Sequence, residues 1–257
     1  MVLASASPAR LSTLQMAGIE AETRVSNIDE DAVLSAATIT SEHSLDAEEQ
    51  VIILARAKAE DVALTLLDEH DAATPLSAAE EAARHGDIDD AAHPPSSGNP
   101  GTGEGDDATR PPSSSDLPDF VLGCDSMLEL DGAIMGKPAN ASQARERWLQ
   151  MRGRTGVLHT GHWLMDLRGR GRKVVAEGAT SSTRVHFANL SEAEIDAYLA
   201  TTEPLRVAGA FTVDGYGGPY VTRIEGDHHG VVGLSLPVLR ELLSRRDVMI
   251  HELWSTH

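Results

Sequence analysis

The amino-acid sequence predicts an α/β fold, organised as one domain across residues 1–257. Segments with strand-like and helix-like patterns alternate along most of the chain, which is the order typical of α/β domains. Hydrophobic residues make up 41% of the chain, which is enough for a core. One stretch, residues 68–118, departs from this pattern and is predicted to be an insertion within the domain.

The first elements are predicted to be a strand and two helices. Residues 2–6 are a short apolar run and predict a strand. A helix follows at once, because Ser7 suits the N-cap, Pro8 suits the first turn, and Gly18 ends the apolar spacing. A second helix is predicted over 47–67, where apolar residues recur along one stripe.

Residues 68–118 are predicted to be disordered. The stretch has no aromatic residue, seven of the twelve prolines, and twelve acidic residues against two basic ones, so it carries −10 of the net charge of −19. Such a segment buries too little apolar surface to offset its ordering entropy, apart from a frayed helix over 76–84. It is either a tolerated surface-loop expansion, which we favour, or a regulatory or partner-binding segment.

After the insertion, the patterns again predict strands and helices in turn. Residues 120–123 form a buried strand that leads into Cys124, Asp125 and Ser126. The later elements are a hairpin of strands 127–130 and 133–135 around Asp131 and Gly132, a helix over 142–151, paired strands over 156–167 and 173–188, and helices near 191–200 and 236–245.

Composition also restricts the partners and the compartment. A formal net charge of −19 is opposite in sign to the basic face of nucleic-acid-binding proteins, so no nucleic-acid polymer is expected as a partner. The single cysteine allows no intrachain disulfide, and the sequence has neither a signal peptide nor an apolar run of about 18 residues. We therefore expect a cytoplasmic protein with no membrane partner. If its ligand is a polyanion, its few cations must be gathered locally.

The strand-to-helix junction around Ser5, Ser7 and Arg10 is the first candidate site. Free N–H groups and the positive end of the helix dipole attract anions at such a junction. Two hydroxyls and an arginine would complete a phosphate-binding site, although the Gly-Lys-Ser/Thr of a P-loop is missing. For this segment alone, an ordinary capped helix is the simpler interpretation.

Lys58, Asp125 and Lys137 are further candidates. Helical periodicity places Lys58 on the apolar stripe, so its ammonium must reach either water or an anion. Asp125 follows a buried strand, where α/β folds place ligand chemistry, and it is suited to binding a divalent metal or activating water. Lys137 follows the predicted hairpin and is suited to holding a phosphate oxygen. A snorkelling lysine and a turn aspartate are the alternatives that remain open.

Cysteine and histidine give weaker signals. No histidine is fixed beside Cys124 by the sequence, so a buried core residue is a better interpretation than a nucleophile. His159 and His162 are three residues apart in a strand and point to opposite faces, so they are not expected to bind one metal. His228 and His229 are predicted to lie in a loop.

Taken together, these segments resemble the Maf family, also called septum formation inhibitors. LASASPAR at 3–10 resembles the opening L-A-S-x-S-P-R-R, and GCDS at 123–126 resembles G-A-D-T. The other matching motifs, in order, are SNIDE at 26–30, LARAKA at 54–59, LDG at 130–132, GKP at 136–138, LSEAEI at 190–195, AGAF at 208–211, IEGD at 224–227 and VGL at 232–234. The similarity therefore spans the chain outside the insertion.

The resemblance implies a two-lobed Maf/ITPase-like fold, with a mixed sheet flanked by helices, a central cleft and often a homodimer. It also implies a nucleoside triphosphate pyrophosphatase, which hydrolyses canonical or modified (d)NTPs to the monophosphate and pyrophosphate. Asp125 matches the family's proton acceptor, and Glu30 with Asp125 would hold Mg²⁺ or Mn²⁺. The implied phosphate-contacting residues are Ser5, Ser7, Arg10, Lys58 and Lys137.

Three positions that the resemblance implies for base specificity differ from both known subgroups. Ala9, Ser126 and Asp214 stand where the subgroup acting on dTTP and UTP has Arg, Thr and Gln, and where the subgroup acting on 7-methyl-GTP has Trp, Gln and Glu. A carboxylate only accepts hydrogen bonds, which suits guanine N1–H and N2–H₂ or an exocyclic amine. Asp214 is therefore predicted to move the preference away from dTTP and UTP.

Two other functions remain open on the sequence alone. One is a non-catalytic regulator of cell division that acts through protein contacts, for which the acidic insertion would be suited. The other is a hydrolase that uses Cys124, which thiol alkylation would block and chelators would not. The pyrophosphatase explains more of the motifs, and we favour it.

Overall fold

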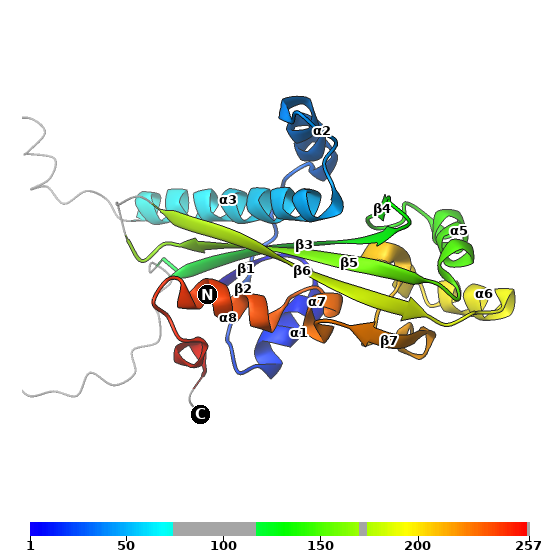
Figure 1. Cartoon of the computed structure of the whole chain (residues 1–257). Coiled ribbons are helices and arrows are strands. Elements are labelled where there is room, and N and C mark those ends of the chain that lie inside the picture. The colour runs from blue at the N-terminus through cyan, green and yellow to red at the C-terminus, as the bar shows by residue number, and fades with distance from the viewer. Residues whose placement is uncertain (74–116, 170–173, 256–257) are drawn as a thin grey trace, which may run out of the picture. The chain divides into compact units, whose positions relative to one another are not determined.

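The computed structural model describes residues 1–73, 117–169 and 174–255 (Figure 1). Residues Met1–Leu64 and Pro118–His257 group into one compact unit, and Thr65–Leu117 group into another. Most of the predicted insertion, including the helix expected over 76–84, lies outside the described residues. The sheet described below belongs to the first unit.

A seven-stranded mixed sheet forms the centre of this unit, in the order β2-β1-β3-β5-β6-β7, with β4 paired to β3 beside that path. β1 runs parallel to β2 and β3, whereas β3–β4, β3–β5, β5–β6 and β6–β7 are antiparallel. The strands are β1 (Val2–Ala4), β2 (Glu22–Thr23), β3 (Phe120–Leu130), β4 (Ala133–Met135), β5 (Thr155–Asp166), β6 (Val175–Phe187) and β7 (Val221–Glu225). The predicted α/β class is confirmed.

β3 differs from its prediction in a way that matters for the site. Residues 120–130 form one strand of eleven residues rather than a short strand followed by a hairpin arm, so Asp125 lies in its middle and not at its end. On one side, β3 pairs with β1 only up to Gly123 and with β4 only from Leu128. Between those two positions no strand among the described residues borders that side of β3, which leaves an opening in the sheet.

Helices cover both faces of the sheet (Figure 1). α3 lies along one face, and α7 and α8 pack against β5 and β6 on the other. The helices are α1 (Pro8–Met16), α2 (Glu30–Thr40), α3 (Ala47–Ala73), α5 (Ala141–Met151), α6 (Glu192–Ala200), α7 (His228–Val232) and α8 (Leu236–Ser244), with 3₁₀ turns η1 (Glu203–Arg206), η2 (Ala208–Ala210), η3 (Gly218–Tyr220) and η4 (Ile250–Leu253).

Two glycines bring α3 close to the sheet. A Cβ at Gly123 of β3 would overlap the carbonyl oxygen of Ala55, and a Cβ at Gly161 of β5 would overlap that of Val51. Gly161 is the cross-strand neighbour of Asp125, and Gly123 lies on the same face of β3 as Asp125 because side chains alternate along a strand. The bare backbone at both positions therefore lets the helix lie directly above Asp125.

Two expectations about helices require correction, and one helix was not predicted. α3 continues to Ala73 instead of ending near 67, because the change to a polar, acidic composition at 68 removes apolar surface without adding a helix breaker. The predicted loop at His228 and His229 is the first turn of α7, whose N-cap Asp227 accepts hydrogen bonds from the next backbone amides. α2 was not predicted, since none of its residues is buried and its apolar pattern is weak.

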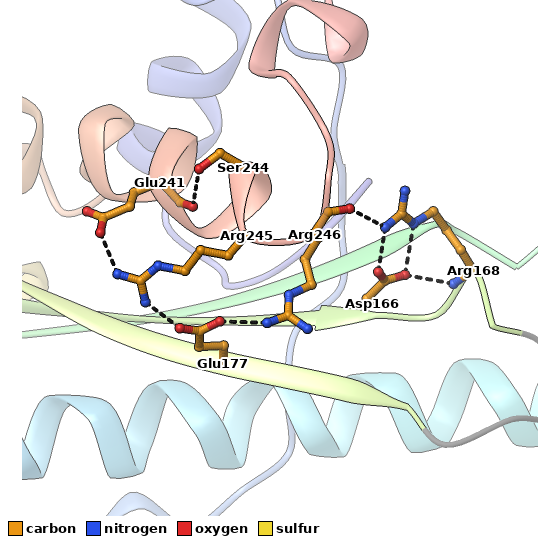
Figure 2. A network of polar contacts seen from close by, with 7 residues as sticks. All are labelled: Asp166, Arg168, Glu177, Glu241, Ser244, Arg245 and Arg246. Atoms are coloured by element: carbon orange, nitrogen blue, oxygen red, sulfur yellow. Dashed lines mark hydrogen bonds and ion pairs between the residues drawn. The ribbon is translucent and has the colours of Figure 1, made fainter.

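Polar contacts join the end of α8 to the β5–β6 hairpin (Figure 2). Glu177 of β6 forms ion pairs with Arg245 and Arg246, and the carbonyl of Arg246 accepts a hydrogen bond from Arg168 at 2.8 Å. Arg168 in turn pairs with Asp166 at 2.6 Å. Most of these side chains are partly exposed, so each pair stabilises the fold by at most about 1 kcal/mol.

Two apolar clusters account for most of the core. One surrounds Trp148 between α5, α6 and β6, and the other surrounds Leu122 between β3, α1 and α8. Among the described residues, no helix combines the length and the apolarity needed to span a bilayer.

Candidate active site

One cleft of about 760 Å³ opens beside the gap along β3. Its volume is in the range that holds a small-molecule ligand. Its wall includes every residue for which the sequence predicted a role in the site: Ser5, Ser7, Ala9, Arg10, Glu30, Lys58, Asp125, Ser126, Lys137 and Asp214. Residues from six separate segments of the chain therefore meet in one place.

A buried ion pair lies at the floor of the cleft. Lys58 Nζ is 2.5 Å from Asp125 Oδ1, and both side chains are only 11% exposed. Lys58 Nζ also lies 2.7 Å from Glu30 Oε1, at the first turn of α2. The alternative of a lysine that merely snorkels to water is wrong, because its ammonium is held between two carboxylates.

The two carboxyl groups have different environments. Burial raises the pKa of Asp125 above its ordinary value, and the repulsion of Glu30 acts in the same direction, although Lys58 and Arg10 oppose the shift. For Glu30, partial burial also acts to raise the pKa, but the hydrogen bond and charge of Lys58 and the charges of Lys137 and Arg10 together lower it. The pKa values of the two carboxyl groups are therefore shifted in opposite directions by the same site.

The N-terminus of α1 is open toward the cleft. Ser7 is the N-cap residue, but its side chain makes no capping hydrogen bond. Ser5 Oγ accepts hydrogen bonds from the Ser7 amide at 3.2 Å and from Arg10 at 3.1 Å, which leaves its own hydroxyl hydrogen free to donate. The first amides of a helix have no partners within it, and because Pro8 has no N–H, the amides of Ala9 and Arg10 are the backbone donors that this turn offers to an anion.

Arg10 is held by the protein more completely than its predicted phosphate role requires. Its guanidinium donates to the carbonyls of Gly233 and Cys124, both at 2.8 Å, and to the hydroxyls of Ser5 and Ser126, both at 3.1 Å. These bonds use four of its five N–H groups and leave one for a ligand. Arg10 therefore organises the walls of the cleft and contributes its charge to it.

Ser126 is part of the same arrangement. Its hydroxyl lies 2.9 Å from Thr160 Oγ1, and Thr160 donates to the carbonyl of Gly230 at 2.8 Å. Because Thr160 has only one hydroxyl hydrogen, Ser126 must be the donor between the two hydroxyls. Ser126 thus accepts from Arg10 and donates to Thr160.

Lys137 lies just after β4, at the rim of the cleft, and is exposed. Among the described residues it forms no ion pair, and its charge acts on Glu30 from a distance. Arg206 also lines the cleft, so four cationic side chains from the described part of the chain reach it in an otherwise acidic protein.

Glu203 also lies in the wall of the cleft, and sequence reasoning missed it. Asp214 lies in a loop together with Tyr216, and this loop contacts the carboxylate of Glu203. Glu203 precedes a proline in a polar turn, which is an ordinary position for an exposed glutamate and gives no signal of a role in the site.

Cys124, His159 and His162 lie outside this chemistry. Burial raises the pKa of the fully buried Cys124 thiol to about 12, so the thiolate that a cysteine-dependent hydrolase requires does not form at neutral pH. His159 contacts Ser182 at 2.9 Å, whereas His162 accepts a hydrogen bond from the Ser235 amide at 2.7 Å. The two histidines thus have different neighbours on opposite faces of β5, as expected.

Asp125 and Glu30 are the residues suited to a divalent cation. Carboxylate oxygens are the ligands that Mg²⁺ and Mn²⁺ prefer, and one or two carboxylates with substrate phosphates are a common way to bind Mg²⁺. Among the described residues, no group of three or more His, Cys, Asp or Glu side chains is placed to hold a metal. The donor set therefore fits a cation that arrives with a polyphosphate ligand.

Comparison with known proteins gives consistent matches over the whole length of the chain. The family model described as "Maf-like protein" matches residues 1–246. A protein of Salinispora tropica named "Nucleoside triphosphate pyrophosphatase" is 44% identical over 255 residues, which are 99% of this chain and 87% of that protein. Proteins with the same name from Leifsonia xyli subsp. xyli and Mycobacterium marinum are 42% and 38% identical, over 99% and 100% of this chain and 96% and 97% of theirs.

Proposed function

Because this chain belongs to the Maf-like protein family, we propose that it is a nucleoside triphosphate pyrophosphatase. In this reaction water attacks the α-phosphorus, and the bond to the oxygen that bridges the α- and β-phosphates breaks. The products are the monophosphate and pyrophosphate. The observation that carries the proposal is the convergence of Asp125, Lys58 and the open N-terminus of α1 on one cleft. The names of the relatives support it.

The phosphates would bind between α1 and Lys137. Hydrogen-bond donors and positive charge are supplied by the hydroxyl hydrogen of Ser5, the uncapped first turn behind Ser7 and the ammonium of Lys137, which forms no ion pair with the described residues. Lys58 has three N–H groups, of which two point to Asp125 and Glu30, so one is left for a phosphate oxygen. These groups would stabilise the negative charge that develops on the leaving pyrophosphate.

Asp125 would accept the proton of the attacking water. A general base works best when its pKa approaches the working pH, and burial moves the pKa of Asp125 in that direction. The charges of Lys58 and Arg10 oppose this rise and favour the carboxylate form of Asp125. The ion pair with Lys58 also fixes the position of the carboxylate.

Asp125 and Glu30 would also hold a Mg²⁺ or Mn²⁺ ion bound to the phosphates. Such an ion supplies Lewis-acid stabilisation of the phosphoryl oxygens. Because no group of three or more metal-ligating side chains is placed together among the described residues, we expect Mn²⁺ to bind weakly to the protein alone and at least about tenfold more tightly when a non-hydrolysable nucleotide is present. Electron paramagnetic resonance of free Mn²⁺ measures both affinities, and equal affinities would contradict this donor set.

Asp214 would set the base preference from the opposite wall. Its carboxylate favours bases that present N–H donors, such as guanine, over the edges of uracil and thymine. Ala9 leaves room near α1, and Ser126 contributes through its hydrogen bond to Arg10. Efficient hydrolysis of dTTP with poor turnover of GTP-type nucleotides would contradict this assignment.

A panel of canonical and modified nucleoside triphosphates tests the reaction itself. Purified protein is incubated in H₂¹⁸O with Mg²⁺ or Mn²⁺, with and without EDTA, and the products are resolved by mass spectrometry. We expect a metal-dependent formation of monophosphate and pyrophosphate, with ¹⁸O in the monophosphate. Label in pyrophosphate would place the attack at the β-phosphorus, and diphosphate with orthophosphate would refute the proposed reaction. Absence of turnover would favour the regulator that acts through protein contacts.

A further inference from the structure

The loop that carries Asp214 is folded around the side chain of Glu203. Glu203 Oε1 accepts hydrogen bonds from the hydroxyls of Thr212 at 2.6 Å and Tyr198 at 2.8 Å, and from the amide of Gly217 at 3.0 Å. Glu203 Oε2 accepts from the amide of Tyr216 at 3.0 Å. One carboxylate therefore binds both ends of the loop 212–217.

The loop can approach this carboxylate only because two of its residues are glycines. A Cβ at Gly215 would overlap Glu203 Oε2, and a Cβ at Gly217 would come within 2.5 Å of the hydroxyl oxygen of Tyr198. The Tyr198 hydroxyl also accepts the Thr212 amide at 3.2 Å. The two glycines therefore let the backbone of the loop pack directly against the Glu203 carboxylate and the Tyr198 hydroxyl.

The charge of Glu203 is balanced by neutral donors. Among the described residues, no lysine, arginine or histidine forms an ion pair with it, although its carboxylate is half-buried. Partial burial acts to raise its pKa, but the hydrogen bonds from Thr212, Tyr198 and the two amides together lower it. A charged acceptor with four donors is among the stronger hydrogen-bonded arrangements in proteins.

The residues between the two ends of the loop line the cleft. Asp214 and Tyr216 both form part of its wall, and Tyr216 is 70% exposed. A carboxylate and an aromatic ring offer a hydrogen-bond acceptor and a stacking surface, which are the two features that recognise a purine-type base. Their positions depend on the backbone that Glu203 holds.

We propose that Glu203 is a positioning residue for base recognition, which fixes the loop 212–217 so that Asp214 and Tyr216 face the base of a bound nucleotide. This inference rests on the proposed function and extends it to the opposite wall of the cleft. Glu203 would act on binding and base discrimination, while the chemical step belongs to Asp125.

Two variants of Glu203 remove different numbers of the hydrogen bonds that hold the loop. If the glutamine oxygen takes the place of Oε1, it keeps the three bonds to Thr212, Tyr198 and Gly217, and its NH₂ group meets the Tyr216 amide as a second donor. Only the Tyr216 amide is then released. Glu203→Ala releases all four donors. Glu194→Gln is the matched control, since Glu194 caps α6 through Ser191 and does not line the cleft.

Two measurements test the proposal, and the first does not depend on activity. By hydrogen exchange, Glu203→Gln should increase the exchange rate of the Tyr216 amide at least about fivefold, and Glu203→Ala should do so for Gly217 as well. By steady-state kinetics, Glu203→Ala should raise KM and reduce the preference for GTP-type over UTP-type nucleotides, each about tenfold. We expect kcat to stay within about threefold and Glu194→Gln to match the wild type.

Unchanged exchange at Tyr216 and Gly217 would overturn the proposal, whatever the kinetics. So would a loss of kcat with KM and base preference unchanged, because that pattern would assign Glu203 to the chemical step. A wild-type protein that hydrolyses no nucleotide would refute the proposed function and the base-recognition role together, while faster exchange in the variants would still support the loop contact. The two failures are therefore distinguishable.

Discussion

Replacing Lys58 by methionine should destabilise the protein far more than an equivalent change elsewhere on α3. The substitution keeps an unbranched stem but leaves the buried Asp125 carboxylate without its partner at 2.5 Å. Removing one member of a buried ion pair costs about 3–5 kcal/mol. The contact with Glu30, whose side chain is 48% exposed, adds at most about 1 kcal/mol.

Arg56→Met is the matched control, two residues earlier on the same helix. Arg56 pairs with Glu60 at 2.7 Å with both side chains largely exposed, and its guanidinium lies 5.4 Å from the ring centroid of Trp163. These contacts are worth about 1 kcal/mol together. Urea denaturation followed by circular dichroism gives both costs, and a Lys58→Met cost no larger than that of Arg56→Met would refute the reasoning.

The loss of unfolding free energy in Lys58→Met should also depend on pH. The burial of Asp125 determines whether this loss grows or shrinks as the pH rises. Asp125 already has a raised pKa in the folded protein, and loss of the Lys58 charge raises it further. Between the pKa of the unfolded chain and that higher value, the folded state binds more protons, so its stability falls as the pH rises. The difference between variant and wild type should shrink at acidic pH, where Asp125 is protonated.

A double variant with Asp125→Asn should be less destabilised than the sum of the two single variants by about 2 kcal/mol.

Three further predictions follow from the cleft. Asp125→Asn and Lys137→Ala should each abolish nearly all turnover with an unchanged circular dichroism spectrum, and activity within a few-fold of wild type would refute those roles. Ser7→Ala should leave the urea midpoint unchanged, because the Ser7 side chain makes no capping bond, while KM rises several-fold. Asn140→Ala removes a side chain that does cap its helix, and it should lower the free energy of unfolding by about 1 kcal/mol without changing KM. Iodoacetamide at pH 8 should neither label the folded protein at Cys124 nor inhibit it, and parallel labelling and inactivation would restore the cysteine mechanism.

The parts of the fold that the sequence predicted are those with local signals. The apolar stripe of α3 identified the helix and placed Lys58 on its inner side, and Ser7 with Pro8 marked the start of α1. The continuity of β3 through Asp125 was not predictable in the same way, because a polar residue inside a strand looks like its end until the neighbouring strands are known.

The non-local contacts of the site were beyond sequence reasoning. The carbonyls that hold Arg10 belong to Cys124 and Gly233, which are more than a hundred residues away along the chain. Glu203 was missed for a related reason, since two of the four donors to its carboxylate are backbone amides, which carry no residue identity. Residue types indicated the chemistry of the cleft, and packing decides which donors remain available to a ligand.

The two glycines beneath α3 have a consequence for how the enzyme can change during evolution. The spacing between Lys58 and Asp125 depends on bare backbone at Gly123 and Gly161, and the smallest alternative side chain already overlaps the helix carbonyls. No intermediate size exists between glycine and alanine, so this spacing cannot be adjusted in small steps. A substitution at either glycine is therefore expected to inactivate the protein without touching a reacting group.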